Sequence, residues 1–290
     1  MNTNDTSIIV PVYNAVDTIA PCLESLLANI DKSVQAEIIV VDNGSDDGTL
    51  TKLRQFCNQV TVIEEPIKGS SAARNAGIRH SNFNILAFTD ADCVVESDWL
   101  ENLIAPLADP NIGIVGGTIL PLPGANKIAN YGQVIYDHKQ AIRSFKPPFA
   151  ITANWAMNRR ILSHTGDFDV ALIQGHDVDL AWKALEWGYR LHFEEQAVVY
   201  HHNRNSKIKL FVQGLGHGFW AVALLKNHRR LLKTWGVSRF DWDRYIRLGS
   251  DLVGLANPEE RETRFLNVVF NSAKIVGRLV GAMKFRYFVL

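Results

Sequence analysis

Residues 83–93 read FNILAFTDADC, and the fold can be worked out from this stretch. An apolar run over residues 85–88 stops at two carboxylates, Asp90 and Asp92, which stand one residue apart. A hydrophobic core does not favour neighbouring like charges, because they repel each other unless a cation lies between or beside them. The stretch therefore predicts a buried strand whose end either enters solvent or faces a positively charged ligand.

Apolar runs alternate with helix-like segments through the first 120 residues. We expect strands over residues 7–11, 37–42, 60–65, 83–89 and 112–119. Helices are expected over residues 19–27, 46–56, 70–80 and 97–107, where apolar residues recur at helical spacing. This alternation indicates an α/β fold with a mostly parallel central sheet and helices on both faces.

Polar residues gather at the carboxyl ends of these strands. Pro11–Tyr13 end the first strand, Asp42 ends the second, and Asp90–Asp92 follow the fourth. Ligands of such sheets bind in the crevice outside the carboxyl ends, so we expect these residues on one rim. Mg²⁺ and Mn²⁺ take hard oxygen ligands, and Mg²⁺ usually combines one or two carboxylates with substrate phosphates. The pattern predicts a metal with a phosphate-bearing ligand; the alternative is a solvated loop.

Composition and charge limit the function classes. The chain has 290 residues, of which 47% are hydrophobic, an ordinary globular composition. Residues 1–204 contain 15 Lys+Arg and 24 Asp+Glu, whereas residues 205–290 contain 15 and 6. Such a basic tail predicts contact with an anionic surface, or else a solvated helical face. Three cysteines without metal or disulfide spacing fit a reducing, cytoplasmic location. Neither a signal peptide nor a membrane-spanning helix is expected.

The rhythm of the sequence changes after residue 120. We expect a helix near Tyr131–Ile142, a helix over residues 176–188, one or two strands after it, and helices over 206–235 and 265–288. The last helix has an apolar side made of Leu266, Val269, Phe270, Ala273, Val276, Val280 and Met283. Its basic residues are Lys274, Arg278, Lys284 and Arg286. This combination predicts a peripheral helix on an anionic membrane.

Several motifs in order resemble one enzyme family. SIIVPVYNAVDTIAPCLESL, EIIVVDNGSDDGT, KGSSAARNAGI and ILAFTDADC resemble the nucleotide-sugar half of inverting family-2 glycosyltransferases of bacterial polysaccharide type, which have the GT-A fold. NWAMNRRIL, GDFD, GHDVDLAWKALEWGYRLHF and AVVYHHNRNS resemble the acceptor half. The resemblance implies a GT-A domain over residues 1–205, divided into a nucleotide-sugar half (1–120) and an acceptor half (121–205). A helical, basic extension over residues 206–290 follows.

The resemblance also implies a nucleotide-binding set. Its members are Pro11, Val12, Tyr13, Asp42, Arg74, Asp90 and Ala91. In this reading Tyr13 would stack on the base, and Asp42 would accept a hydrogen bond from the base imide. Arg74 would lie near the phosphates or support the Asp-x-Asp loop, and Asp90 would meet the ribose. The residues alone leave simpler alternatives open: a half-buried tyrosine, a turn cap by Asp42 and a surface ion pair of Arg74.

The resemblance also implies metal-binding and catalytic residues. Asp92 would hold Mn²⁺ or Mg²⁺, and His201 would approach the metal, with His202 as the alternative. Asp177 would be the general base that takes the proton of the acceptor hydroxyl, or it would only cap its helix. We expect the helix N-terminus to favour its ionised form.

Two residues near the implied base complete the predicted site. His176 stands where the family usually has glutamate, so it would support the base or contact the acceptor. Trp155 would lie on the acceptor side, since indoles often form platforms under sugar rings; the alternative is a core tryptophan.

The resemblance implies metal-dependent, inverting hexosyl transfer from a UDP- or dTDP-linked sugar to a glycan or lipid-linked acceptor. The departure at His176 motivates an alternative, a non-catalytic nucleotide-sugar-binding or scaffold protein. A dinucleotide oxidoreductase is disfavoured because no Gly-x-Gly-x-x-Gly turn follows the first strand. A nucleic-acid partner is disfavoured because no recognised module appears. The apolar segment 206–235 would pack on its own body or on a second copy in a homo-oligomer.

Overall fold

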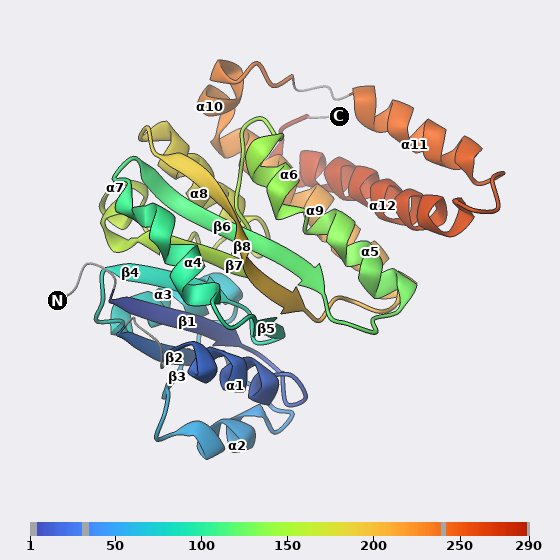
Figure 1. Ribbon diagram of the computed structural model, residues 1–290. Helices are drawn as coiled ribbons and strands as arrows, with labels where there is room; N and C mark the ends of the chain where they lie inside the picture. Colours follow the sequence, from blue (N-terminus) through green and yellow to red (C-terminus); the bar gives the residue numbers. More distant parts are fainter. Residues whose placement is uncertain (1–4, 31–34, 239–241, 289–290) are drawn as a thin grey trace. The chain divides into compact units, whose positions relative to one another are not determined.

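The computed structural model describes residues 5–30, 35–238 and 242–288, and these form two compact units (Figure 1). Residues 1–122 and 136–202 make the first, which we call the sheet unit; residues 123–135 and 203–290 make the second, the helical unit. The expected boundary lay at residue 205, and residues 121–205 were expected together. In the structure, Pro123–Ile135 groups instead with the C-terminal helices.

A mixed sheet of eight strands, counted over the described residues, has the order β3-β2-β1-β4-β7-β6-β8-β5. The strands are β1 Thr6–Val12, β2 Ala36–Asp42, β3 Thr61–Glu64, β4 Ile85–Thr89, β5 Cys93–Val95, β6 Ile112–Pro121, β7 Asn154–Asn158 and β8 Arg190–His201. The first four strands pair in parallel, as expected, and so do β6 and β8. Strand β7 is antiparallel to β4 and β6, and β5 is antiparallel to β8.

Helices of the sheet unit follow the expected alternation. They are α1 Ile19–Ile30, α2 Thr49–Leu53, α3 Ser70–His80, α4 Trp99–Ile104, α6 His138–Arg143, α7 Leu162–Thr165 and α8 His176–Glu186, with 3₁₀ turns over Arg54–Phe56, Ala105–Ala108 and Arg159–Ile161. The helix expected near Tyr131–Ile142 is two helices, α5 (Lys127–Ile135) and α6. The break falls at Asp137, whose carboxylate accepts a hydrogen bond from the Gln140 N–H and so starts α6.

The sheet buries both of its faces, which explains its near-continuous apolar strands. Ile8 and Val10 of β1 belong to a core that includes residues of α1, whereas Ile9 between them belongs to a second core with residues of α3. The parallel register places Val12 opposite Asp42 and Ile9 opposite Phe88. The carboxyl ends of β1, β2 and β4 therefore open onto one rim.

The helical unit is built on a close pair of long helices. It contains α5, α9 (Lys207–Asn227), α10 (Arg229–Thr234), α11 (Trp242–Gly254) and α12 (Arg261–Phe285). A Cβ atom on Gly218 would meet the Lys274 backbone, and one on Gly277 would meet the Leu215 backbone. Helices α9 and α12 thus pack backbone against backbone, in a way that only glycine allows at these positions.

This packing corrects the expectation that residues 265–288 offer one continuous apolar side to lipid. Leu266, Phe270 and Ala273 are buried inside the helical unit. A further difference concerns α9: among the described residues, it alone is long and apolar enough to cross a membrane, judged by length and composition only. A core helix passes the same test, and α9 supplies part of the interface with α12.

Adding one methyl group at the α9–α12 contact should destabilise the helical unit. We expect Gly218→Ala and Gly277→Ala each to lower the free energy of unfolding by about 1–3 kcal/mol, because the new Cβ meets backbone that cannot rotate away. Urea denaturation followed by circular dichroism measures the change. Gly249→Ala in α11 is the matched control, since its Cβ meets no atom within 4 Å; it should stabilise by about 0.5–1 kcal/mol. Equal stability of all three variants would contradict the close contact.

Candidate active site

The rim beside β1 and β2 carries an exposed ring and a buried carboxylate. Tyr13 is exposed, and the Lys68 ammonium lies 4.8 Å from the centroid of its ring. Oδ2 of Asp42 accepts hydrogen bonds from the backbone N–H groups of Gly44 (3.0 Å) and Ser45 (3.1 Å). Its Oδ1 is buried and has no hydrogen-bond partner among the described residues. Asp42 therefore caps the turn with one oxygen and leaves the other able to accept a further hydrogen bond.

Two residues of the expected nucleotide-binding set point away from this rim. The side chains of Val12 and Ala91 are buried in the core that includes α1 residues. They can meet a ligand only through backbone atoms, which corrects the expectation that they line a base pocket. Pro11, at the same strand end, is half-buried.

Arg74 on α3 joins two distant parts of the chain. Its Nη2 donates to Oδ1 of Asp90 at 2.6 Å, and its Nη1 donates to Nε2 of His176 at 2.7 Å. The arginine side chain is only 3% exposed, so the pair is not the surface ion pair that the sequence left open. Its guanidinium carbon also lies 6.0 Å from the centroid of the Phe168 ring. Arg74 thus holds the end of β4 against the start of α8.

The contact with Arg74 fixes the chemistry of His176. An arginine N–H can only donate, so Nε2 accepts and the neutral ring carries its proton on Nδ1. Burial and the neighbouring Arg74 charge lower the pKa of His176 to about 3, although Asp179 opposes the shift. His176 is therefore neutral at physiological pH, and within the part of the chain that the structure describes its buried Nδ1–H has no acceptor.

Asp177 follows at the N-terminus of α8 and is half-buried. Its Oδ1 accepts a hydrogen bond from the Val178 N–H at 2.9 Å. Burial raises the pKa of Asp177; the Val178 hydrogen bond and the Arg74 charge lower it, and Asp90 raises it. The sequence suggested that the helix N-terminus sets the ionisation of Asp177, but the helix end does not act alone. Desolvation opposes it, and moves the carboxylate toward the basicity that a general base requires.

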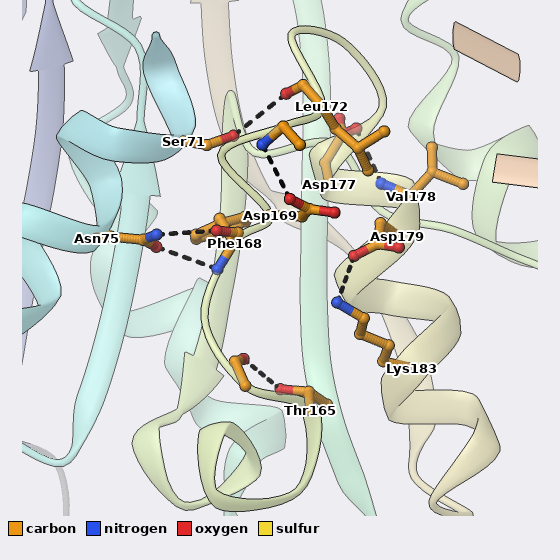
Figure 2. A network of polar contacts seen from close by, with 12 residues as sticks. Ser71, Asn75, Thr165, Phe168, Asp169, Leu172, Asp177, Val178, Asp179 and Lys183 are labelled. Carbon is orange, nitrogen blue, oxygen red and sulfur yellow. Dashed lines mark hydrogen bonds and ion pairs between the residues drawn. The ribbon is translucent and has the colours of Figure 1, made fainter. Parts of the chain in front are cut away.

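Helix α3 also holds the loop that leads into α8 (Figure 2). The side-chain amide of Asn75 donates to the Phe168 carbonyl (2.8 Å) and accepts from the Phe168 N–H (3.0 Å). The Ser71 hydroxyl donates to the Leu172 carbonyl at 3.5 Å. Together with Arg74, these contacts fasten residues 168–177 to α3 and set the place of Asp177.

Asp92 and His201 meet because β5 pairs with β8. Cys93 lies opposite His201 in the antiparallel register, and the His202 N–H donates to the Asp92 carbonyl at 2.9 Å. Nε2 of His201 lies 3.5 Å from Oδ1 of Asp92. His201 is buried, while His202 is exposed. Burial raises the pKa of Asp92, with Asp90 adding to the shift and His201 opposing it.

This pair fits a divalent cation. A carboxylate oxygen of Asp92, a ring nitrogen of His201 and the Cys93 sulfur lie within 4.8 Å of one another. The Cys93 thiol donates to the Ala153 carbonyl, and burial raises its pKa well above the ordinary value, so it remains a thiol. The donor set is then one carboxylate and one imidazole beside a second carboxylate, Asp90. Neighbouring carboxylates favour a bound cation, and carboxylate ligands suit Mg²⁺ and Mn²⁺.

Trp155 does not lie where an acceptor can reach it. It is fully buried in β7, with its ring centroid 6.2 Å from that of Phe88 and 5.8 Å from that of Phe168. The expectation of an acceptor contact is therefore wrong, because β7 is an inner strand of the sheet. Trp155 instead packs on Phe168, and the centroid of the Phe168 ring lies 5.9 Å from that of the His176 ring.

Comparison of the sequence with known proteins identifies the family of this chain. The sequence model of Glycosyl transferase family 2 matches residues 7–166. The chain belongs to this family. The chain is 33% identical over 200 residues to the glycosyltransferase AglE of Haloferax volcanii, covering 67% of this chain and 66% of that protein. It is 28% identical over 244 residues to the pre-mycofactocin glycosyltransferase of Mycobacterium tuberculosis, covering 77% and 48%. It thus spans about two thirds and about half of these relatives.

Solved structures support the same fold for this family-2 chain. One is a mannosyltransferase from Pyrobaculum calidifontis in complex with GDP-Man and Mn²⁺, with a TM-score of 0.66, 19% identity, and coverage of 96% of this chain and 87% of that one. Another is glucosyl-3-phosphoglycerate synthase from Mycobacterium tuberculosis with Mn²⁺, UDP-Glc and phosphoglyceric acid, with a TM-score of 0.57, 18% identity and 81% coverage of each chain. The expected GT-A fold and family are confirmed.

Sequence reasoning missed two residues that the structure places among the candidate site residues. Lys68 contacts the Tyr13 ring and donates to the carbonyls of Asn43 and Gly44, both at 3.0 Å. Asn75 clamps Phe168 on both backbone groups. Both residues lie in the KGSSAARN motif that also supplied Arg74. That stretch, one turn of helix preceded by a lysine, was the available signal.

Proposed function

We propose that this chain catalyses metal-dependent, inverting transfer of a hexosyl group from a nucleoside-diphosphate sugar to a hydroxyl of a glycan or lipid-linked acceptor. One observation carries the proposal: Arg74 contacts both Asp90 and His176, and so brings the Asp90–Asp92 rim and the α8 N-terminus into one charged cluster. Such a transfer needs carboxylates that bind the sugar donor and, close beside them, a candidate general base. Membership in glycosyl transferase family 2 supports the reaction class.

The donor base would be uracil or thymine. Asp42 supports this choice, because its buried Oδ1 has no partner and a pyrimidine imide N–H would supply one. The exposed ring of Tyr13 offers a face on which a planar base can stack. A solved relative holds UDP-Glc, whereas another holds GDP-Man, so the base is the first property to test.

Asp92 and His201 would hold a divalent metal, Mn²⁺ or Mg²⁺. When bound, this ion would neutralise charge on the diphosphate leaving group. Two solved relatives contain Mn²⁺, in accordance with this assignment. Arg74 would supply a second, permanent positive charge, and among the described residues it pairs with the Asp90 carboxylate.

Asp177 would take the acceptor proton. The acceptor oxygen forms a bond to the anomeric carbon, the bond from that carbon to the diphosphate oxygen breaks, and the hydroxyl proton passes to the Asp177 carboxylate. Attack from the face opposite the leaving group inverts the anomeric configuration. The raised pKa of Asp177 suits this role, since a more basic carboxylate accepts the proton more readily.

The alternative, a non-catalytic nucleotide-sugar-binding protein, rests on His176 in place of glutamate. A neutral His176 accepts a hydrogen bond from Arg74, as an anionic residue there also would. The substitution therefore keeps Arg74 positioned and changes only the charge beside it, which favours the catalytic reading.

The donor site is tested by measuring the affinity of nucleoside diphosphates with and without Mn²⁺. UDP is expected to bind at least about tenfold more tightly with Mn²⁺, because Asp92 and His201 would hold the ion and its charge would attract the diphosphate. Asp92→Ala should abolish that difference. Asp98→Ala is the control, since Asp98 is an exposed carboxylate of the same segment. Nucleotide binding that ignores Mn²⁺, or an unchanged metal effect in Asp92→Ala, would remove the metal from the proposal.

A further inference from the structure

Helix α11 exposes a stripe of large apolar side chains. Trp242, Ile246 and Val253 are 70%, 68% and 78% exposed. They are spaced by four and by seven residues, which places them on one face of a helix. Isolated exposed apolar residues are common on proteins, but an aligned set that includes a tryptophan marks a surface that another phase or partner covers.

On the opposite face of α11, the one residue that is buried among those described is an aspartate. Asp251 is buried and accepts hydrogen bonds from Arg264 Nη1 (2.9 Å) and Asn267 Nδ2 (3.0 Å), both on α12. A surface helix of a globular protein normally buries apolar side chains, whereas α11 buries an aspartate and exposes Trp242, Ile246 and Val253. The ion pair with Arg264 anchors it in this orientation, because turning the stripe inward would leave Asp251 and Arg264 without each other.

The helical unit is strongly basic. Residues 123–135 and 203–290 contain 17 Lys+Arg and 6 Asp+Glu, which leaves 13 and 24 for the sheet unit. Three of the six acidic residues are paired within the unit: Asp251 and Glu260 with Arg264, and Glu262 with Lys127. The remaining field is positive and is complementary to an anionic surface.

We propose that α11 docks the protein on an anionic lipid bilayer, with Trp242, Ile246 and Val253 in the interfacial region and the basic side chains of the helical unit on the headgroups. Interfacial helices bind by apolar burial together with charge, and tryptophan favours the membrane–water boundary. A nucleic acid would meet the same charge but would not bury the aliphatic side chains Ile246 and Val253. This proposal is independent of the transfer reaction.

Vesicle binding of the full-length protein tests the docking surface without donor or acceptor. Co-sedimentation with phosphatidylcholine vesicles that contain phosphatidylglycerol should exceed that with phosphatidylcholine alone and should fall as salt screens the charge. The triple variant Trp242→Ser, Ile246→Ser, Val253→Ser should bind anionic vesicles at least about tenfold more weakly. The three side chains are exposed in the parent, so the circular dichroism spectrum and UDP affinity of the variant should match those of the parent.

Two comparisons decide the outcome. Trp187→Ser removes a tryptophan of the sheet unit that is 60% exposed, and it should leave vesicle binding unchanged. The proposal is overturned if the unaltered protein ignores anionic vesicles, or if the triple variant binds them as well as the parent does. Tighter binding of a mixed-sequence oligonucleotide, retained in the triple variant, would assign the basic surface to nucleic acid instead.

Discussion

Asp177→Asn is expected to lower the rate of sugar transfer by about a thousandfold, within the usual range for removal of a general base. The amide has the shape of the carboxylate, and its oxygen still accepts the Val178 N–H, so the α8 N-terminus should remain in place. What is lost is the basicity that burial gives to Asp177. The measurement is kcat with a sugar donor that carries the base preferred in the diphosphate titrations, alongside the affinity for UDP, which should not change.

The control for this variant is Asp167→Asn, an exposed carboxylate of the GDFD segment that should retain full activity. Because burial raises the pKa of Asp177, kcat of the parent should fall as the pH drops through that pKa. Transfer at the parental rate in Asp177→Asn would contradict the assigned base. Nucleotide binding without any transfer in the parent would favour the non-catalytic alternative.

Much of the sheet could be predicted because its first half is locally encoded. Strands β1 to β4 are short apolar runs between helices, so the periodicity reveals them one at a time. Strand β7 escaped notice because NWAMN follows a proline-containing loop and pairs antiparallel with β4, which is far away in sequence. Helix α11 escaped because its buried residue is Asp251, the reverse of the pattern that apolar periodicity detects.

The same distinction between locally encoded features and long-range contacts applies to the candidate site. Residue type and strand position predicted that Asp90, Asp92 and Asp42 would share a rim, and the family resemblance added Arg74, Asp177 and His201. Which side chains of a strand face the ligand could not be predicted, since both faces of the sheet are buried and apolar. Trp155 and Val12 were placed wrongly for that reason. The contact between Arg74 and His176 joins residues 102 positions apart, and no local pattern reports it.

His176→Gln should keep most of the transfer activity and make the protein more stable in acid. A glutamine oxygen can accept the Arg74 hydrogen bond without binding a proton. In the parent, the pKa of His176 is about 3, against about 6.5 in an unfolded chain. Between these values the unfolded state binds more protons, so the parent loses stability as the pH falls below about 6.5. At pH 4.5 this loss is about 2–3 kcal/mol for His176 alone, and the glutamine variant should be spared it.

Urea denaturation at pH 7.5 and at pH 4.5 measures that difference, and two variants control it. His164→Gln replaces an exposed imidazole of the same unit and should leave the pH dependence of the parent intact. His176→Ala removes the acceptor altogether, so it should lose transfer activity that His176→Gln retains, because Arg74 then lacks one of its two partners. If alanine and glutamine behave alike in transfer, the hydrogen bond does not position Arg74. His176 would then contribute through packing against Phe168.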